Sequence, residues 1–377
     1  MKRPFALIGI TYLSVQAALF YLESDLAAAI LTAVCFIGTI VSLFILKNRN
    51  LRHTVLGFCL TAAFASTIFS GYNIFVKQPI VDKYSEREIY VTATVLEQPT
   101  VQYDTYRYLI ETDSINGKIE KLKICLSTIN ELNVEEFDRI SCVLPLKECT
   151  KSQMIADGAF LQASVNKNFA YIVKKTDDKP LYYQAVKIRE NFADSFEQNM
   201  SQDCASLCRA VLLGEKTALS QEIQNDFTRC GVSFLIVVSG MHLAIISSFV
   251  FLCIKKIIKN RVLRSMIMLM CAFSFIAVTG FAPSVVRAGV MLAVVYSGKM
   301  FMRKGDSLNS LGIAALILTV PNPTAVADVG MLLSFTATLG IILWARKISV
   351  YIMGKFAKLK RLKKPVEFTV NLFAVSV

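Results

Sequence analysis

The sequence is poor in charge, in histidine and in tryptophan. Charged residues make up only 18% of the 377 residues, hydrophobic residues make up 54%, and the mean hydropathy is +0.50. This composition excludes an ordinary soluble domain and predicts a polytopic α-helical membrane protein. The only two histidines, His53 and His242, are far apart, so the chain lacks the histidine cluster typical of a catalytic metal site. We expect neither a metal ion nor another cofactor.

Apolar runs of spanning or near-spanning length recur in two groups. They cover residues 4–22, 26–46, 54–76, 232–254, 265–281, 285–302, 308–320 and 328–345, and a further run begins near Val366 and is unfinished at Val377. The first run is longer than a signal-peptide core, so we expect it to be retained. The predicted parts are three N-terminal transmembrane helices (1–76), an extracytoplasmic domain (77–175), linker helices at the outer membrane surface (176–230) and a second transmembrane bundle, truncated in its last span (231–377).

The charges between these runs predict the orientation of the chain. If the N-terminus is cytoplasmic, the cytoplasmic segments carry nearly half of the 41 basic residues and only one of the 28 acidic residues, Asp306. This is the positive-inside asymmetry of multi-pass proteins. The net charge of +13 therefore reports topology and is weak support for nucleic-acid binding. We expect a multi-pass protein of the cell (inner) membrane.

The extracytoplasmic domain has the pattern of β-strands. Its first strand, "REIYVTATVLEQ", alternates apolar and polar residues, and Asn116-Gly117 is a strong signal for a tight hairpin turn. About five such strands favour a small OB-like β-barrel, although a sandwich is the alternative. OB folds bind single strands through basic and aromatic residues. The candidates for this role are Tyr103, Tyr106, Arg107, Tyr108 and Lys123; the alternative is that the tyrosines pack on the barrel, which the slightly acidic charge of this region favours.

The linker and the cysteines leave alternatives open. Residues 181–199 have an amphipathic helical period, which suits either the outer membrane surface or a helix packed on the barrel. Among the ten cysteines, two of Cys125, Cys142 and Cys149 could pair in an oxidising compartment, or all three could be free. Cys204 and Cys208 lie one helical turn apart but have no nearby histidine to complete a zinc site.

A polar motif interrupts the run 232–254. Ser239 and Gly240 lie near its middle, and His242 follows two residues later. Polar groups in hydrocarbon tend to face a bundle interior or a water-filled path, and glycine permits a break in the helix. We therefore expect these residues to line or gate a pathway, with Ser334 as a further candidate. The alternative is a packing role, while a nucleophilic Ser–His pair is disfavoured because no acid lies nearby to orient the ring.

The segment "GFAPSVVRAG" predicts a short outside turn at Pro283 and Ser284. Arg287 would then lie about one turn into the next span, where it could contact phosphate at a pore mouth or extend to the outer headgroups. Asp328 opens the run 328–345. It could cap that helix, which is the favoured prediction, or pair with Arg287 from the same side of the membrane.

Three motifs in order resemble the ComEC family of competence proteins. They are "GVSFLIVVSGMHL" at 231–243, "GFAPSVVRAGVM" at 280–291 and "NPTAVADVGMLLSF" at 322–335. The resemblance implies a channel for single-stranded DNA in natural transformation, with DNA receptor proteins and a helicase-like ATPase as partners and a possible homo-oligomer. Many members also carry a C-terminal metallo-β-lactamase-like nuclease domain, which this sequence lacks. Three positions depart from the family pattern: Phe234, Met331 and Leu332.

The sequence therefore predicts a membrane channel that passes single-stranded DNA into the cytoplasm, surrounded by membrane lipid. Three alternatives stay open: a secondary transporter or exporter of a small anionic solute, a membrane enzyme completed by a further C-terminal segment, and an inactive truncated family member. Whether the longer form is an enzyme is uncertain, because no catalytic site is predicted in this chain. A P-loop is absent, so any motor must be another protein.

Overall fold

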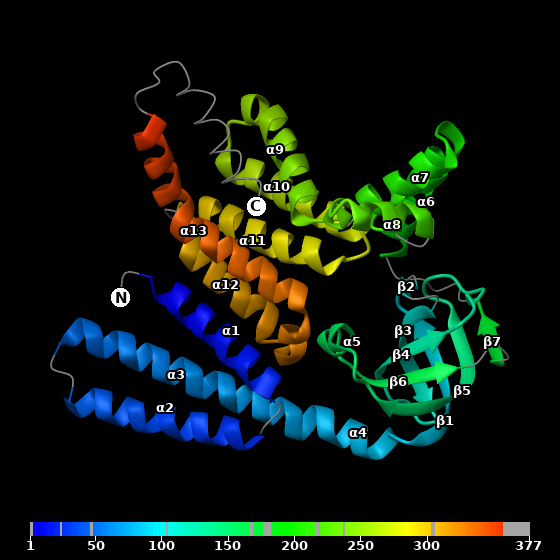
Figure 1. The fold of residues 1–377 in the computed structure, drawn as a ribbon, viewed down its shortest axis with the longest axis horizontal. Helices are drawn as coiled ribbons and strands as arrows, with labels where there is room; N and C mark the ends of the chain where they lie inside the picture. The colour runs from blue at the N-terminus through cyan, green and yellow to red at the C-terminus, as the bar shows by residue number, and fades with distance from the viewer. Residues whose placement is uncertain are drawn as a thin grey trace.

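The computed structural model describes residues 3–356 apart from 23–24, 46–47, 98, 103–104, 166–168, 176–181, 216–218, 237 and 303–305. The apolar run that begins near Val366 lies outside this part. Figure 1 shows a helical bundle with a small β-barrel on one side, joined to it by a long helix and by a group of shorter helices. All ten cysteines are free.

The N-terminal part consists of three long helices, α1 (Pro4–Leu22), α2 (Asp25–Ile45) and α3 (Arg49–Tyr72). The third predicted span was expected to end at residue 76, but the helix continues through a π-turn, η1 (Asn73–Lys77), into α4 (Gln78–Tyr84). A proline in the first turn of α4 lacks a backbone N–H, which explains why the regular ladder is interrupted there. This continuous helix leads directly into the barrel (Figure 1).

Residues 87–165 form a closed five-stranded barrel, as predicted. Its strands are β1 (Arg87–Val95), β3 (Thr105–Ile115), β4 (Lys123–Thr128), β5 (Arg139–Glu148) and β6 (Ala159–Val165). They pair in the order β1-β3-β4-β6-β5, and β5 returns to β1; the β4–β6 pair is parallel and the others are antiparallel. Short strands β2 (Thr100–Gln102) and β7 (Tyr171–Lys174) extend the sheet at β3 and β5.

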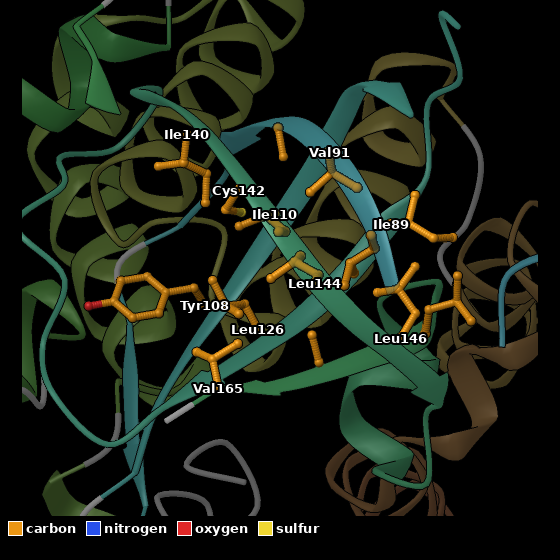
Figure 2. Packing of buried hydrophobic residues seen from close by; sticks show 14 of the residues in the cluster. Ile89, Val91, Tyr108, Ile110, Leu126, Ile140, Cys142, Leu144, Leu146 and Val165 are labelled. Atoms are coloured by element: carbon orange, nitrogen blue, oxygen red, sulfur yellow. The ribbon is translucent and has the colours of Figure 1, made fainter. Parts of the chain in front are cut away.

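The barrel core is built from the inward residues of the alternating strands. Ile110, Leu126 and Leu144 are fully buried, and Figure 2 shows them meeting in the barrel centre. The hairpin prediction at Asn116-Gly117 is confirmed, because both residues have positive φ, +49° and +80°. The sequence pattern was sufficient here because strand alternation and turn chemistry are local properties.

Short helices connect the barrel to the second bundle. They are α6 (Tyr183–Asn199), α7 (Gln202–Cys208), the π-turn η2 (Arg209–Leu213) and α8 (Gln221–Arg229). The amphipathic helix was expected over 181–199, and α6 confirms a helix there. Its buried face carries Val186, Arg189 and Ala193, and α6 contacts the helix α10.

The second bundle contains α9 (Gly240–Ile257), α10 (Arg261–Val278), α11 (Pro283–Met300), α12 (Ser307–Thr319) and α13 (Val329–Phe356), with a 3₁₀ turn η4 (Pro323–Ala327) before α13. The two bundles join where α1 crosses α12. A Cβ on Gly9 would lie 2.1 Å from the carbonyl oxygen of Gly312, so only glycine allows this close approach. Among the described residues, four helical segments are long and apolar enough to cross a membrane: Pro4–Leu22, Leu51–Tyr84, Gly240–Ile257 and Arg261–Val278.

Candidate functional site

The Ser-Gly-Met-His motif starts a helix instead of interrupting one. A 3₁₀ turn, η3 (Ser233–Ile236), precedes it, Ser239 is extended, and α9 begins at Gly240. The expectation that Ser239 and Gly240 lie near the middle of a span was therefore wrong. Hydropathy cannot separate an apolar turn from an apolar helix, because both contain the same residues.

His242 fixes the start of α9. Its Nδ1 accepts a hydrogen bond from the Ser239 backbone N–H at 3.1 Å, and Ser239 Oγ lies 3.1 Å from the same nitrogen. An accepting Nδ1 places the proton of the neutral ring on Nε2. The half-buried ring therefore satisfies one free donor at the helix start and keeps Nε2–H as a donor for another group. The side chain of Phe234 lies outside the part that the structure describes.

The N-terminus of α11 holds this helix start in place. Ser284 Oγ donates to the carbonyl oxygen of Val238 at 2.8 Å. A Cβ on Gly240 would lie 2.8 Å from the Cβ of Ala288, so the glycine permits the contact between α9 and α11. Pro283 occupies the first turn of α11, where a backbone N–H has no partner within the helix, so the missing N–H of proline costs no hydrogen bond. The turn was expected at Pro283 and Ser284, but it lies just before them, at residues 279–281, and both residues belong to the start of α11, where Ser284 supports the motif directly.

Arg287 connects α11 to the start of α13. Its Nη1 lies 2.7 Å from Oδ2 of Asp328, whose Oδ1 accepts from the Gly330 backbone N–H at 2.8 Å. Asp328 therefore both caps the helix and pairs with Arg287, which the sequence had offered as alternatives. Arg287 is only 8% exposed, so it is held inside the bundle and does not extend to the headgroups. Its Nε has no hydrogen-bond partner within the described part of the chain.

The starts of α9 and α13 both lie against the first turns of α11. Contacts between Gly240 and α11 join the starts of α9 and α11, and the Arg287–Asp328 ion pair joins α11 to the start of α13. Each N-terminus carries a partial positive charge and free backbone donors. These N-termini and Arg287 supply positive charge that suits an anion such as a phosphate, and Asp328 and the nearby Asp157 supply negative charge beside it.

The barrel contacts the bundle beside this region. Asn322 Nδ2 donates to the carbonyl oxygen of Ala156 at 2.6 Å, at the end of the short helix α5 (Ser152–Ala156). Burial raises the pKa of the next residue, Asp157, to about 6; Lys123 opposes this shift and Asp328 adds to it. Lys123 Nζ donates to the carbonyl oxygen of Asp157 at 3.1 Å. Lys123, a predicted DNA contact, therefore lies at the junction between the barrel and the bundle.

The other predicted contacts of the barrel lie in different surroundings. Tyr108 is 1% exposed and its hydroxyl accepts from the Leu132 N–H, so this candidate for single-strand binding is buried and unavailable to DNA. It occupies an inward position of β3, as the packing alternative proposed. Tyr106 is half-buried against the core and Arg107 is half-buried. Tyr103 lies outside the described residues.

Ser334, the remaining predicted lining residue, is half-buried on α13. Its backbone carbonyl accepts a hydrogen bond from Thr338 Oγ1 at 2.8 Å. It lies one to two turns from Asp328 along the chain, so it belongs to the same helix as the site but is not among the residues in contact with Arg287.

A buried ion network lies at the linker, and it was not predicted from the sequence. Arg189 of α6 contacts Glu136 of the barrel and, at 3.0 Å, Glu215 after η2. Arg209 also contacts Glu215, at 2.9 Å. Burial raises the pKa of Glu136, and Arg189 opposes that shift. No sequence pattern signals this network, because its members come from three separate segments.

Beside the network lies a cavity of about 230 Å³ with a strongly acidic lining. The ionisable residues around it are Glu97, Glu131, Glu135, Glu136, Glu190 and Arg209. Carboxylates repel phosphate, so this face of the barrel disfavours DNA. Among the described residues, no group of three or more His, Cys, Asp or Glu side chains has a geometry that could hold a metal ion.

Comparison with known proteins agrees with the motifs. The family described as "Competence protein" matches residues 211–377. ComE operon protein 3 of Bacillus subtilis (strain 168) is 24% identical over 161 residues, which is 43% of this chain and 21% of that protein. The chain thus matches about a fifth of the relative's length, and no solved structure matches. The family and the four apolar helices together indicate a membrane protein. The comparisons therefore show that residues 211–377, which contain the start of α9 and the Arg287–Asp328 pair, are similar to the competence protein (ComEC) family.

Proposed function

We propose that this chain forms the membrane part of a channel that passes single-stranded DNA into the cytoplasm during natural transformation. The observation that carries the proposal is that the starts of α9 and α13 both lie against the first turns of α11, which carry the buried Arg287. A DNA strand carries one negative charge for each phosphate. Broken helices whose N-termini face an anion are an established way to bind it inside a membrane.

At the Arg287–Asp328 pair, a DNA phosphate would replace Asp328 as the partner of Arg287. In the unoccupied pathway, Asp328 neutralises the guanidinium at 2.7 Å. An arriving phosphate competes for the same group, which offers a bidentate geometry that matches phosphate oxygens. His242, with Nε2–H available as a donor, and Ser239 would line the same entrance.

The barrel would guide the strand toward this entrance. Its closed five-stranded arrangement, in which β6 inserts between β4 and β5, supports the OB-like assignment. Because the cavity beside Glu136 is acidic, we place any contact with DNA on the junction side near Lys123. The N-terminus would be cytoplasmic, the linker helices external, and a helicase-like ATPase and DNA receptor proteins would act as partners.

Variants of the ion pair test the proposal in cells that depend on this protein for transformation. Arg287→Gln is expected to lower uptake of labelled DNA about tenfold to a hundredfold, because a hydrogen bond to a charged group contributes about 1.5–3 kcal/mol. Arg287→Lys should retain part of the uptake. Membrane levels are measured in parallel, and Arg229→Gln, whose side chain is 81% exposed on α8, is the matched control.

A double variant separates phosphate binding from a structural role. Removing one member of a buried pair destabilises a protein by about 3–5 kcal/mol, whereas removing both can be nearly neutral. If Arg287 only maintains the fold, Arg287→Gln combined with Asp328→Asn should restore uptake. Restored uptake would refute the phosphate contact. Normal DNA uptake in every variant, with a loss of transport of a small organic anion, would favour the solute transporter.

A further inference from the structure

A basic cavity lies at the other end of α10, away from the Arg287 site. It has a volume of about 420 Å³ and is formed by the C-terminal end of α9, the first turns of α10 and the C-terminal end of α11. These three helices contact one another in the bundle (Figure 1). Its lining residues are Phe251, Arg261, Arg264, Ser265, Tyr296, Lys299 and Met302.

The cavity gathers three cations without a carboxylate. Within the described part of the chain, Arg261, Arg264 and Lys299 form no ion pair, and the first turn of α10 contains no acidic residue. Two of these cations lie at the N-terminus of α10, where the helix dipole is positive and cations are unfavourable. The arrangement therefore destabilises the free protein electrostatically and would be compensated by a bound anion.

Aromatic rings hold the cations in place. Lys299 Nζ lies 4.4 Å from the centroid of the Tyr296 ring, and Arg264 Cζ lies 5.4 Å from that of Phe251. Contacts with an aromatic face leave the N–H donors of both cations available for oxygen ligands. The buried Ser265 and Tyr296 add hydroxyl groups to the lining. The cavity thus offers several donors to one small anionic group.

The surface around the cavity is apolar and exposed. Met302 is 76% exposed, and Met266, one position after Ser265, is 49% exposed. A soluble anion would gain nothing from this surface, whereas the acyl chains of a lipid would cover it. From this continuity of basic cavity and apolar surface, we infer that the cavity is a binding site for the phosphodiester headgroup of an anionic phospholipid.

The inferred site agrees with the predicted orientation, which places Lys255 to Arg264 on the cytoplasmic side. It does not depend on DNA transport. An anionic lipid would bridge α9, α10 and α11 at the end opposite to the Ser239–Arg287 region. The same helices would then be fixed at both ends.

The test measures lipid binding by the purified full-length protein in detergent. Dioctanoyl-phosphatidylglycerol and dioctanoyl-phosphatidylcholine are titrated separately, and bound lipid is counted by native mass spectrometry. The protein should prefer phosphatidylglycerol. Arg261→Gln combined with Arg264→Gln should weaken that binding roughly tenfold or more, given the usual contribution of a basic residue at an anionic lipid surface. The double substitution by lysine should retain most of it.

A charge-matched control makes the result specific. Lys255→Gln combined with Lys256→Gln removes the same charge from exposed positions on the last turn of α9, outside the cavity lining. This control should leave phosphatidylglycerol binding unchanged. Equal losses in the two double variants, or equal binding of the two lipids, would overturn the inference. So would a single-stranded oligonucleotide that displaces the lipid and itself depends on Arg261 and Arg264, because the cavity would then belong to the DNA path.

Discussion

Removing Arg189 should separate the barrel from the linker helices. The proposed change is Arg189→Met, which keeps much of the side-chain volume and removes the charge. Arg189, Glu136 and Glu215 are 5%, 7% and 5% exposed, so bulk water solvates the two carboxylates poorly. Glu215 retains Arg209 at 2.9 Å, but Glu136 forms no other ion pair within the described part of the chain.

The expected loss of folding free energy depends on how many carboxylates lose their only ion-pair partner. Leaving one buried charge unpaired destabilises a protein by about 3–5 kcal/mol, and only Glu136 is left in that position. We therefore expect a loss of about 4 kcal/mol, not twice that value. This is a large part of the usual folding free energy of about 5–15 kcal/mol. Arg229→Met, which removes an exposed ion pair, should change stability by less than about 1 kcal/mol.

The loss of stability in Arg189→Met should be larger at high pH than at low pH. Burial already raises the pKa of Glu136, and Arg189 opposes this shift, so the variant should raise that pKa further. A carboxyl whose folded pKa lies above its unfolded pKa destabilises the fold at high pH. This effect disappears as the pH falls toward the unfolded value, about 4.3 for glutamate. The deficit of Arg189→Met should therefore be larger at pH 8 than at pH 5.

Buried thiols report the unfolding of the barrel. Cys125, Cys142 and Cys149 are at most 3% exposed, so they react with a thiol-specific dye only when the barrel opens. The thermal midpoint of dye reaction is compared for the parent, the variant and the control at both pH values. Adding Glu136→Gln to Arg189→Met should recover most of the loss. A deficit below about 1 kcal/mol at pH 8, or one independent of pH, would refute the assignment of this network as the link between barrel and linker.

Two further predictions concern the helix crossing and the junction. Gly312→Ala should destabilise the detergent-solubilised protein by about 1–3 kcal/mol, because the added Cβ would lie 2.1 Å from the Phe5 carbonyl oxygen. In the control, Gly298→Ala, the added Cβ meets no atom within 4 Å, so this variant should be neutral or slightly stabilising. Equal thermal unfolding midpoints for the two variants would contradict this prediction. Asp157→Asn should stabilise the fold by roughly 1–3 kcal/mol at pH 7.5 but not near pH 4, because burial raises the pKa of Asp157 to about 6 and its ionised form is unfavourable above that pH. Unfolding curves measured at both pH values test this. An equal change in stability at the two pH values would contradict it.

The sequence alone predicted the features that depend on neighbouring residues. Strand alternation gave the five barrel strands, and Asn116-Gly117 gave the turn between two of them, because only small or glycine residues accept positive φ there. The apolar runs predicted most helices to within a few residues; the exceptions are α3, which continues into α4, α9, which starts at Gly240 and not at 232, and α13, which extends to Phe356. The ordered motifs indicated the family whose model matches residues 211–377, since motifs depend on sequence and not on packing.

Only the tertiary structure decided which distant groups meet. Arg287 and Asp328 are 41 positions apart, and the pair exists because α11 packs beside the start of α13. The polar motif is a helix start held by α11, because Ser284 bonds the carbonyl oxygen of Val238 and Ala288 packs against Gly240, and hydrophobic periodicity does not contain these contacts. Tyr108 is inward because barrel closure buries that face of β3. The sequence thus determines the local helices, strands and turns. Packing between them determines which charged groups pair and where the helices begin, and the proposed channel depends on both.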